Sequence, residues 1–160
     1  MILIQNIKTL TLDDFAILRM FHVKHFHEYY ISDNSFTAYL SQPQYTTYGM
    51  FHVKRLIGYA IFLNGGVDAD IIYIATSPKF RRYGVASALI ARYITDYKIS
   101  NLFIEVATRN TIALRFYNTN SFEIIGVRRK YINGNDAYLM VKRLAKCCLY
   151  TIFYTKILYI

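Results

Sequence analysis

The stretch that most constrains this chain runs from Asp70 to Ala107 and alternates strand-like and helix-like patterns. Apolar residues, many of them β-branched or aromatic, dominate Asp70–Thr76 and Asn101–Ala107, which predicts two strands. Between them, apolar residues recur at helical spacing from Arg82 to about Tyr97. A strand–helix–strand crossover is right-handed, and its strands run parallel in one sheet. This unit therefore predicts a sheet with a central parallel pair and a helix on its face.

The rest of the chain supplies further elements on both sides of this unit. Capping residues and apolar periodicity predict helices that begin at Thr11-Leu12, Ser32-Asp33 and Asn110. Strands are expected at Ile2–Ile7, Thr46–Val53, Leu56–Leu63, Phe122–Arg129 and Asp136–Arg143. The order β-α-α-β-β-β-α-β-α-β-β predicts a mixed α/β fold, with a mostly antiparallel sheet of about seven strands and about four helices.

Two turns and one helix face are predicted from local pattern alone. Lys54-Arg55 indicates a tight hairpin turn, and Asn133-Gly134 indicates a type I′ turn between the last two strands. The first helix is expected to bury residues at roughly helical spacing, namely Leu12, Phe15, Leu18, Met20 and Val23.

A chain of 160 residues is long enough for one domain with a sizeable core. We expect that domain over residues 1–144 and an apolar tail over residues 145–160, which is too short to span a bilayer comfortably. The tail could extend freely, pack on the domain, pair with another subunit or touch a membrane surface. The absence of a secretory signal and the adjacent pair Cys147-Cys148, which would form a strained disulfide, favour a cytoplasmic protein.

The net charge of +9 is unevenly distributed. From Lys79 onward the chain holds 14 of its 19 Lys and Arg residues but only four of its ten acids. Such a pattern favours an anionic partner for the second half, and nucleic acid, acidic lipid and a polyphosphate cofactor all satisfy it.

The loop between the Asp70–Thr76 strand and the following helix is suited to phosphate. A helix start exposes unpaired backbone N–H groups and a partial positive charge. Gly84 lets the backbone approach a phosphate closely, and Arg81 and Arg82 add charged donors. Neither the dinucleotide-binding G-x-G-x-x-G nor the P-loop pattern is present, so Rossmann and P-loop sites are poor candidates.

Three successive motifs resemble the GNAT acetyltransferases. Arg81–Ala86 is similar to the family's [RQ]-x-x-G-x-[GA] signature, Asn110–Tyr117 to its N-x-x-A-x-x-x-Y pattern, and Ser121-Phe122 to its G-F pair. Asn135–Met140 resembles the last strand of the ribosomal-protein-alanine branch, the RimI type. The resemblance implies acetyl-CoA as cosubstrate, bound by Ile74, Ala75, Thr76, Arg81, Arg82, Tyr83, Gly84, Val85, Ala86 and Asn110.

The same resemblance implies two catalytic side chains. Glu105 matches the family's general base, which takes a proton from the acceptor amine directly or through water. Tyr117 matches the tyrosine that protonates the departing thiolate. The alternatives are an outward-facing charge for Glu105 and core packing for Tyr117.

The acceptor implied by the branch is a protein N-terminus, with a ribosomal-protein alanine favoured. Phe26–Ser32 lacks the His-Pro-Trp segment usual in that branch, which leaves a polyamine or aminoglycoside as the alternative acceptor. A catalytically inactive relative and a non-catalytic basic RNA-binding module are the remaining alternatives. The run Arg128-Arg129-Lys130 is typical of a solvated strand end, with the acceptor site or ribosomal RNA as other readings.

No metal and no direct DNA contact are expected. His22, His25 and His27, with His52 as a fourth candidate, form a helical cluster of the kind that is usually surface or core histidine, and adjacent cysteines lack the C-x-x-C spacing of zinc or redox sites. The oligomeric state is left open.

Overall fold

The computed structural model describes residues 6–26, 31–132 and 134–144. Its four α-helices are α1 (Phe15–Phe26), α2 (Asp33–Ser41), α3 (Val85–Asp96) and α4 (Thr111–Thr119). Its strands are β1 (Ile7–Thr9), β2 (Tyr45–His52), β3 (Arg55–Gly65), β4 (Asp68–Thr76), β5 (Asn101–Ala107), β6 (Glu123–Ile132) and β7 (Asn135–Arg143). None of the helices in these described residues is long and apolar enough to cross a membrane.

All seven strands form one sheet in the order β1-β2-β3-β4-β5-β7-β6. Neighbouring strands are antiparallel except β4 and β5, which the crossover through α3 makes parallel. The predicted α/β fold with a central parallel pair is therefore confirmed.

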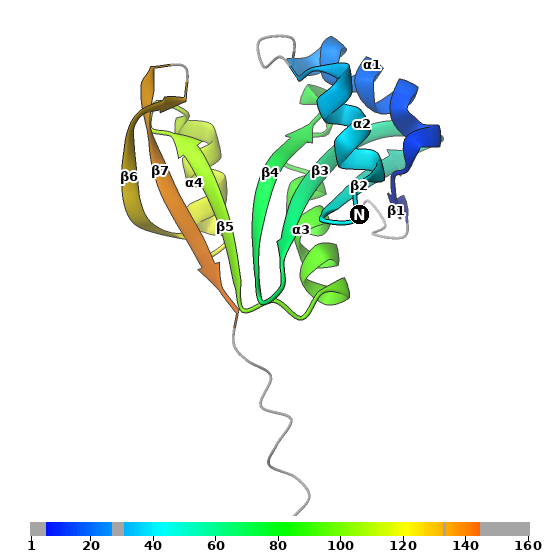
Figure 1. The fold of residues 1–160 in the computed structure, drawn as a ribbon. Helices are drawn as coiled ribbons and strands as arrows, with labels where there is room; N and C mark the ends of the chain where they lie inside the picture. The colour runs from blue at the N-terminus through cyan, green and yellow to red at the C-terminus, as the bar shows by residue number, and fades with distance from the viewer. Residues whose placement is uncertain (1–5, 27–30, 133, 145–160) are drawn as a thin grey trace, which may run out of the picture.

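The helices cover both faces of the sheet (Figure 1). On one face, α1 and α2 bury Leu18 and Phe36 against Tyr59 and Ile61 of β3. On the other face, α3 and α4 bury a larger cluster that includes Leu89, Tyr93, Leu102, Tyr117 and Met140. The two cores lie on opposite sides of the sheet because successive side chains of a strand point to opposite faces.

The central parallel pair separates soon after it begins. β4 and β5 are paired only from Asp68 with Asn101 to Asp70 with Phe103. Beyond this point β4 continues beside β3 to Thr76, and β5 continues beside β7 to Ala107. The sheet therefore opens as a V in its middle, which is plain between β4 and β5 in Figure 1.

Local predictions were right for most elements and wrong at three points. The third helix begins at Val85 instead of Arg82, because Arg82 and Gly84 have φ angles of 66° and 80°, which helical residues do not adopt. The first hairpin turns at Val53-Lys54, both in the left-handed region, and Arg55 already belongs to β3. Of the residues expected on the buried face of the first helix, Leu12, Met20 and Val23 are 50%, 72% and 51% exposed, whereas Phe21 and His22 are buried.

Three further expectations fall wholly or partly on residues outside the described ranges. The first strand begins its described part at Ile7, so most of the Ile2–Ile7 prediction lies outside the described residues. Asn133 of the predicted last turn and the tail 145–160 also lie outside them, and Gly134 has the positive φ of 75° that such a turn uses.

Candidate active site

The opening between β4 and β5 exposes one edge of β4 to a ligand. From Tyr73 to Thr76 this strand has partners on β3 but none on β5. Its backbone groups on the β5 side therefore have no strand partner, and backbone donors and acceptors in that position pair readily with an extended ligand. Ile74, Ala75 and Thr76, which the sequence assigns to the cosubstrate, all lie on this edge.

The start of α3 lies beside the end of β4 and is open. Gly84 is the N-cap in the left-handed conformation, and no side chain bonds to the cap among the described residues. A Cβ placed on Gly84 would meet no atom within 4 Å. The backbone N–H groups of the first turn, which Val85 and Ala86 begin, are thus accessible to an anion, as the helix dipole favours.

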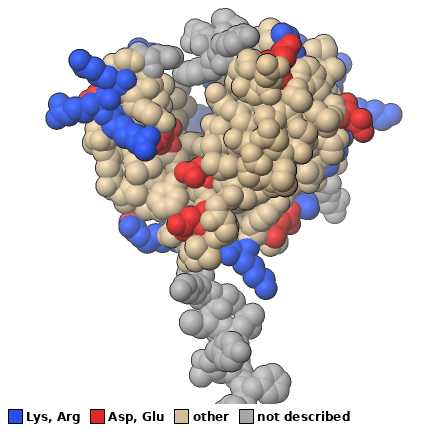
Figure 2. Space-filling model, viewed as in Figure 1, with Lys and Arg blue, Asp and Glu red and all other residues tan. Residues whose placement is uncertain are grey.

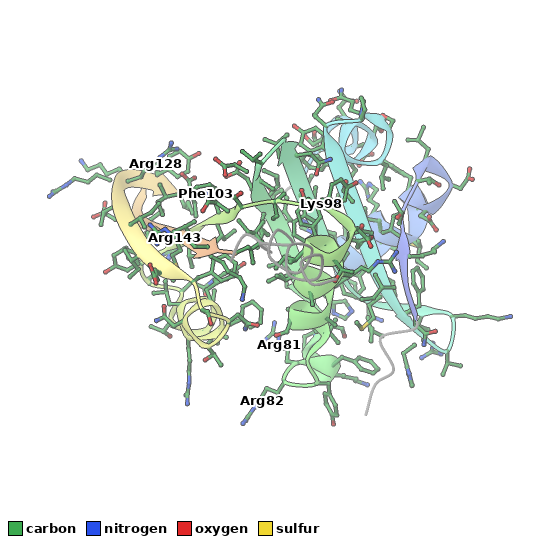
Figure 3. The ribbon with its side chains drawn as sticks, turned by 90° about the horizontal axis from the view of Figure 1, so that it is seen from below. Arg81, Arg82, Lys98, Phe103, Arg128 and Arg143 are labelled. Carbon is green, nitrogen blue, oxygen red and sulfur yellow. The ribbon has the colours of Figure 1, made fainter. Side chains whose placement is uncertain are left out.

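Two arginines stand in this loop, and a third lies on the other side of the sheet. Figure 3 shows Arg81 and Arg82 at the start of α3, on the side of the sheet that carries α4, whereas Arg128 lies on the opposite side. Tyr83, between Arg82 and Gly84, is 65% exposed. The site therefore has a basic side at the start of α3 and a second side, on the opposite face of the sheet, where Arg128 of β6 lies.

One buried polar atom at the end of β4 has no partner. The Thr76 hydroxyl is shielded from solvent and makes no hydrogen bond within the described part of the chain. An unsatisfied buried hydroxyl is costly, so a partner in a bound ligand would be favourable. This orphan hydroxyl, the unpaired β4 edge and the open helix start fit the amides and phosphates of coenzyme A.

Glu105 lies on the face of β5 opposite to α3 and α4. Its neighbours Ile104 and Val106 point into the α3–α4 core, so alternation directs Glu105 to the other face. There its Oε1 lies 3.0 Å from Nη1 of Arg128 on β6. Asp70 of β4 is near enough for the Glu105 charge to raise its pKa, although burial is the larger cause.

Tyr117 lies on the other side of β5 from Glu105. It is 3% exposed, packs its ring against Phe116 and Phe122, and belongs to the core that includes Ile104 and Val106. Burial raises the pKa of its hydroxyl above the usual value near 10, so the phenol stays protonated and can serve as a proton donor. A thioester between the diverging strands would have Glu105 on one side and Tyr117 on the other.

Asn110 has a structural role in the described structure. It is the N-cap of α4, and its Oδ1 accepts a hydrogen bond of 3.1 Å from the backbone N–H of Ala113. A cap of this kind stabilises a helix by about 1 kcal/mol. The side-chain oxygen is thus engaged within α4, and its predicted contact with the cosubstrate stays a prediction.

Comparison with known proteins identifies the family to which the chain belongs. Residues 8–122 match the model of the acetyltransferase (GNAT) family. The chain belongs to the GNAT acetyltransferase family. It is therefore an acetyl-CoA-dependent N-acetyltransferase, as its motifs predicted.

Named relatives of this acetyltransferase include RimI-type enzymes. An N-alpha-acetyltransferase RimI of Mycobacterium tuberculosis is 27% identical over 112 residues, 66% of this chain and 71% of that protein. The ribosomal-protein-S18-alanine N-acetyltransferase of Escherichia coli has a TM-score of 0.79 at 21% identity, over 92% of this chain and 98% of that one. NAA60 of Arabidopsis thaliana in complex with acetyl-CoA has a TM-score of 0.75 at 18% identity, over 86% and 97%.

Two features of this GNAT site are not visible in its motifs. Local pattern assigns Asp70 only to a strand, and it leaves the run Arg128-Arg129-Lys130 as a solvated strand end, with the acceptor site or ribosomal RNA as alternatives. The structure separates that run: Arg128 pairs with Glu105, whereas the backbone N–H of Lys130 donates to Asp136. Both features depend on strand register, which no local sequence signal in this chain specifies.

The histidines that the structure describes contact aromatic side chains. His22 is buried, and its Nδ1 lies 2.7 Å from the Tyr59 hydroxyl. His52 contacts the ring of Phe80 instead, and His27 lies outside the described residues. Within the described ranges, no three His, Cys, Asp or Glu side chains are placed to hold a metal ion.

Proposed function

We propose that this acetyltransferase acetylates the α-amine of a protein N-terminus, with a ribosomal-protein alanine as the favoured acceptor. The observation that carries the proposal is the V between β4 and β5, with Glu105 on one face and the α3 start and Tyr117 on the other. The thioester of the donor can then lie between the two strands, and the acceptor amine can approach its carbonyl carbon from the Glu105 side of the sheet.

Donor binding is proposed for the residues that the motifs selected. Arg81, Arg82 and the first-turn amides after Gly84 would hold the pyrophosphate, and the free edge of β4 would pair with the pantetheine amides. Bound there, acetyl-CoA supplies an acetyl thioester. The RimI-type relative and the acetyl-CoA complex of NAA60 support this assignment.

We assign the two proton transfers of the reaction to opposite faces of the sheet. A neutral amine forms the C–N bond while the C–S bond breaks, so one proton must leave nitrogen and one must reach sulfur. Glu105 accepts the proton from the amine, and Tyr117 donates its proton to the departing thiolate. We assign stabilisation of the oxyanion to a backbone N–H on the Tyr73–Thr76 edge, which has no partner on β5. An α-amine has a pKa near 7.7–8.0, so only a modest push from a base is needed to supply the neutral amine.

One observation favours a small cationic amine as a second candidate. Asp70 and Glu105 lie close enough to interact on the acceptor side. Figure 2 shows acidic side chains along the boundary between the part of the molecule that holds β1–β4 and the part that holds β5–β7. Such charges attract a polyamine or an aminoglycoside as readily as a peptide ammonium.

Mass spectrometry of acceptor mixtures separates the two candidates. The full chain is incubated with acetyl-CoA and peptides that start with alanine, serine or methionine, together with spermidine and an aminoglycoside. Acetylation of the alanine peptide, and none of the same peptide with a blocked α-amine, is the expected result. Acetylated spermidine beside unmodified peptides would overturn the proposed acceptor while leaving the reaction class intact.

A further inference from the structure

The salt bridge between Glu105 and Arg128 crosses an intervening strand. Ala107 of β5 is paired with Ala137 of β7, and Ala137 is paired with Arg128 of β6. Paired residues share a face, and Glu105 lies two residues before Ala107 on that face. Because Ala137 has only a methyl group, the Arg128 side chain can pass over β7 and reach the Glu105 carboxylate at 3.0 Å.

Arg128 has a second anchor on its own strand. Its guanidinium carbon lies 4.7 Å from the centre of the Tyr131 ring, an arrangement that attracts a cation to the ring face. The pairing of β6 with β7 is irregular between Arg128 and Ile132, and Lys130 has a φ of 52°. This irregularity places Tyr131 beside Arg128, so the guanidinium is held between a ring and a carboxylate.

The other charged neighbour of Glu105 is an anion, Asp70, which repels the Glu105 carboxylate. Asp70 comes from β4, and Phe103, its register partner, lies two residues before Glu105 on one face of β5. Burial raises the pKa of Asp70, and the charges of Glu105 and Asp68 raise it further. The adjacent β7 residue, Leu139, is apolar. Among the described residues, Glu105 is thus faced by an anion from β4 and a cation from β6.

We propose that Arg128 is a positioning residue for acetyl transfer, which holds the Glu105 carboxylate in place on the acceptor face against repulsion from Asp70. The inference rests on the proposed role of Glu105 as the base. A general base must lie within hydrogen-bond reach of the amine, and a like charge displaces a carboxylate that no cation holds. Removal of Arg128 therefore leaves Glu105 with the repulsion of Asp70 and without this contact.

The first test follows the Glu105 carboxyl directly. Its side-chain ¹³C signal is identified by its absence from Glu105→Gln, and the position of this signal at neutral pH is compared between variants of the full chain. Arg128→Gln is expected to move the signal, because the contact at 3.0 Å is lost. Removal of the repelling charge as well, in the Arg128→Gln/Asp70→Asn double variant, is expected to reduce that change.

Arg129→Gln is the matched control. It removes the same charge one residue away, on the opposite face of β6, and Arg129 makes no salt bridge in the described part of the chain. The Glu105 signal of this variant is expected to stay where it is in the unsubstituted protein. Equal signal positions for Arg128→Gln and Arg129→Gln would overturn the proposal.

The second test is kinetic and separates this inference from the proposed function. Arg128→Gln is expected to lower kcat about three- to tenfold with unchanged KM for acetyl-CoA, and Arg128→Lys to recover part of the loss. In a Glu105→Gln background, Arg128→Gln should have no further effect, because its effect passes through Glu105. A full additional loss there would overturn the inference alone. Full activity of Glu105→Gln would overturn the proposed base as well.

Discussion

Gly58 of β3 lies so close to Val85, the first residue of α3, that a Cβ on Gly58 would stand 2.6 Å from Val85 Cγ1. The same Cβ would lie 2.9 Å from the backbone oxygen of Ala75 on β4. A glycine at this position therefore lets α3 begin against the end of the strands that carry the predicted cosubstrate site. The contact fixes the helix start relative to the free edge of β4.

Gly58→Ala is expected to destabilise the protein by about 1–3 kcal/mol, because a backbone atom and a core methyl group must both move. The affinity for coenzyme A should fall as well, since the start of α3 shifts. Urea unfolding and calorimetric titration measure the two effects. Gly126→Ala is the control, because a Cβ there meets only Leu139 Cβ, at 4.0 Å. Equal stability of the two variants would contradict the prediction.

Glu105→Gln is expected to lower kcat by about 10²- to 10⁴-fold, because the amide cannot accept the proton of the amine. The dissociation constant of acetyl-CoA should be unchanged, since Glu105 lies on the acceptor face. Steady-state kinetics and direct binding give the two values. Glu123→Gln, which removes a carboxylate that pairs with Arg143 at the surface, should retain normal turnover.

Tyr117→Phe keeps the ring contacts with Phe116 and Phe122 and removes only the hydroxyl. Turnover is expected to fall by about 10- to 100-fold through loss of the proton donor. An acetyl thioester of a more acidic thiol should lose less turnover on this substitution, because its thiolate departs more easily without a proton. Equal losses for both thioesters would show that Tyr117 acts only through packing.

The stability of the protein should fall at alkaline pH in part through Tyr117. Burial raises the pKa of Tyr117 above its unfolded value near 10, so the unfolded chain loses this proton first. The stabilisation is complete below about pH 10 and is lost progressively as pH rises above it. Urea unfolding from pH 8 to 11 should give a shallower decline for Tyr117→Phe, and identical slopes would contradict the assignment.

Arg81→Ala is expected to weaken the binding of coenzyme A by about fivefold, roughly 1 kcal/mol, because a charged donor to phosphate is lost. The loss should shrink as salt is raised, since the interaction is partly screened. Lys98→Ala, beyond the far end of α3, removes the same charge away from the helix start and serves as the control. Equal weakening by both variants would indicate a general charge effect.

Local sequence pattern correctly predicted the features that depend on a single segment of the chain. Ser32 accepts a hydrogen bond from the backbone N–H of Ser35 and caps α2 as predicted, and β5 spans the predicted Asn101–Ala107. Pattern failed at α1, where Met20 and Val23 are exposed and His22 is buried. A histidine enters that core because the Tyr59 hydroxyl, from a distant strand, lies 2.7 Å from its Nδ1.

The order of elements, the parallel pair and a basic, glycine-containing loop before the third helix all follow from the sequence alone, because short-range periodicity, capping and backbone freedom specify them. The charges that face Glu105 are known only from the assembled sheet. Arg128 and Asp70 lie 23 and 35 residues away in sequence, and strand register brings them to one face. Register is fixed by which side chains the whole sheet can bury, so it depends on every strand at once.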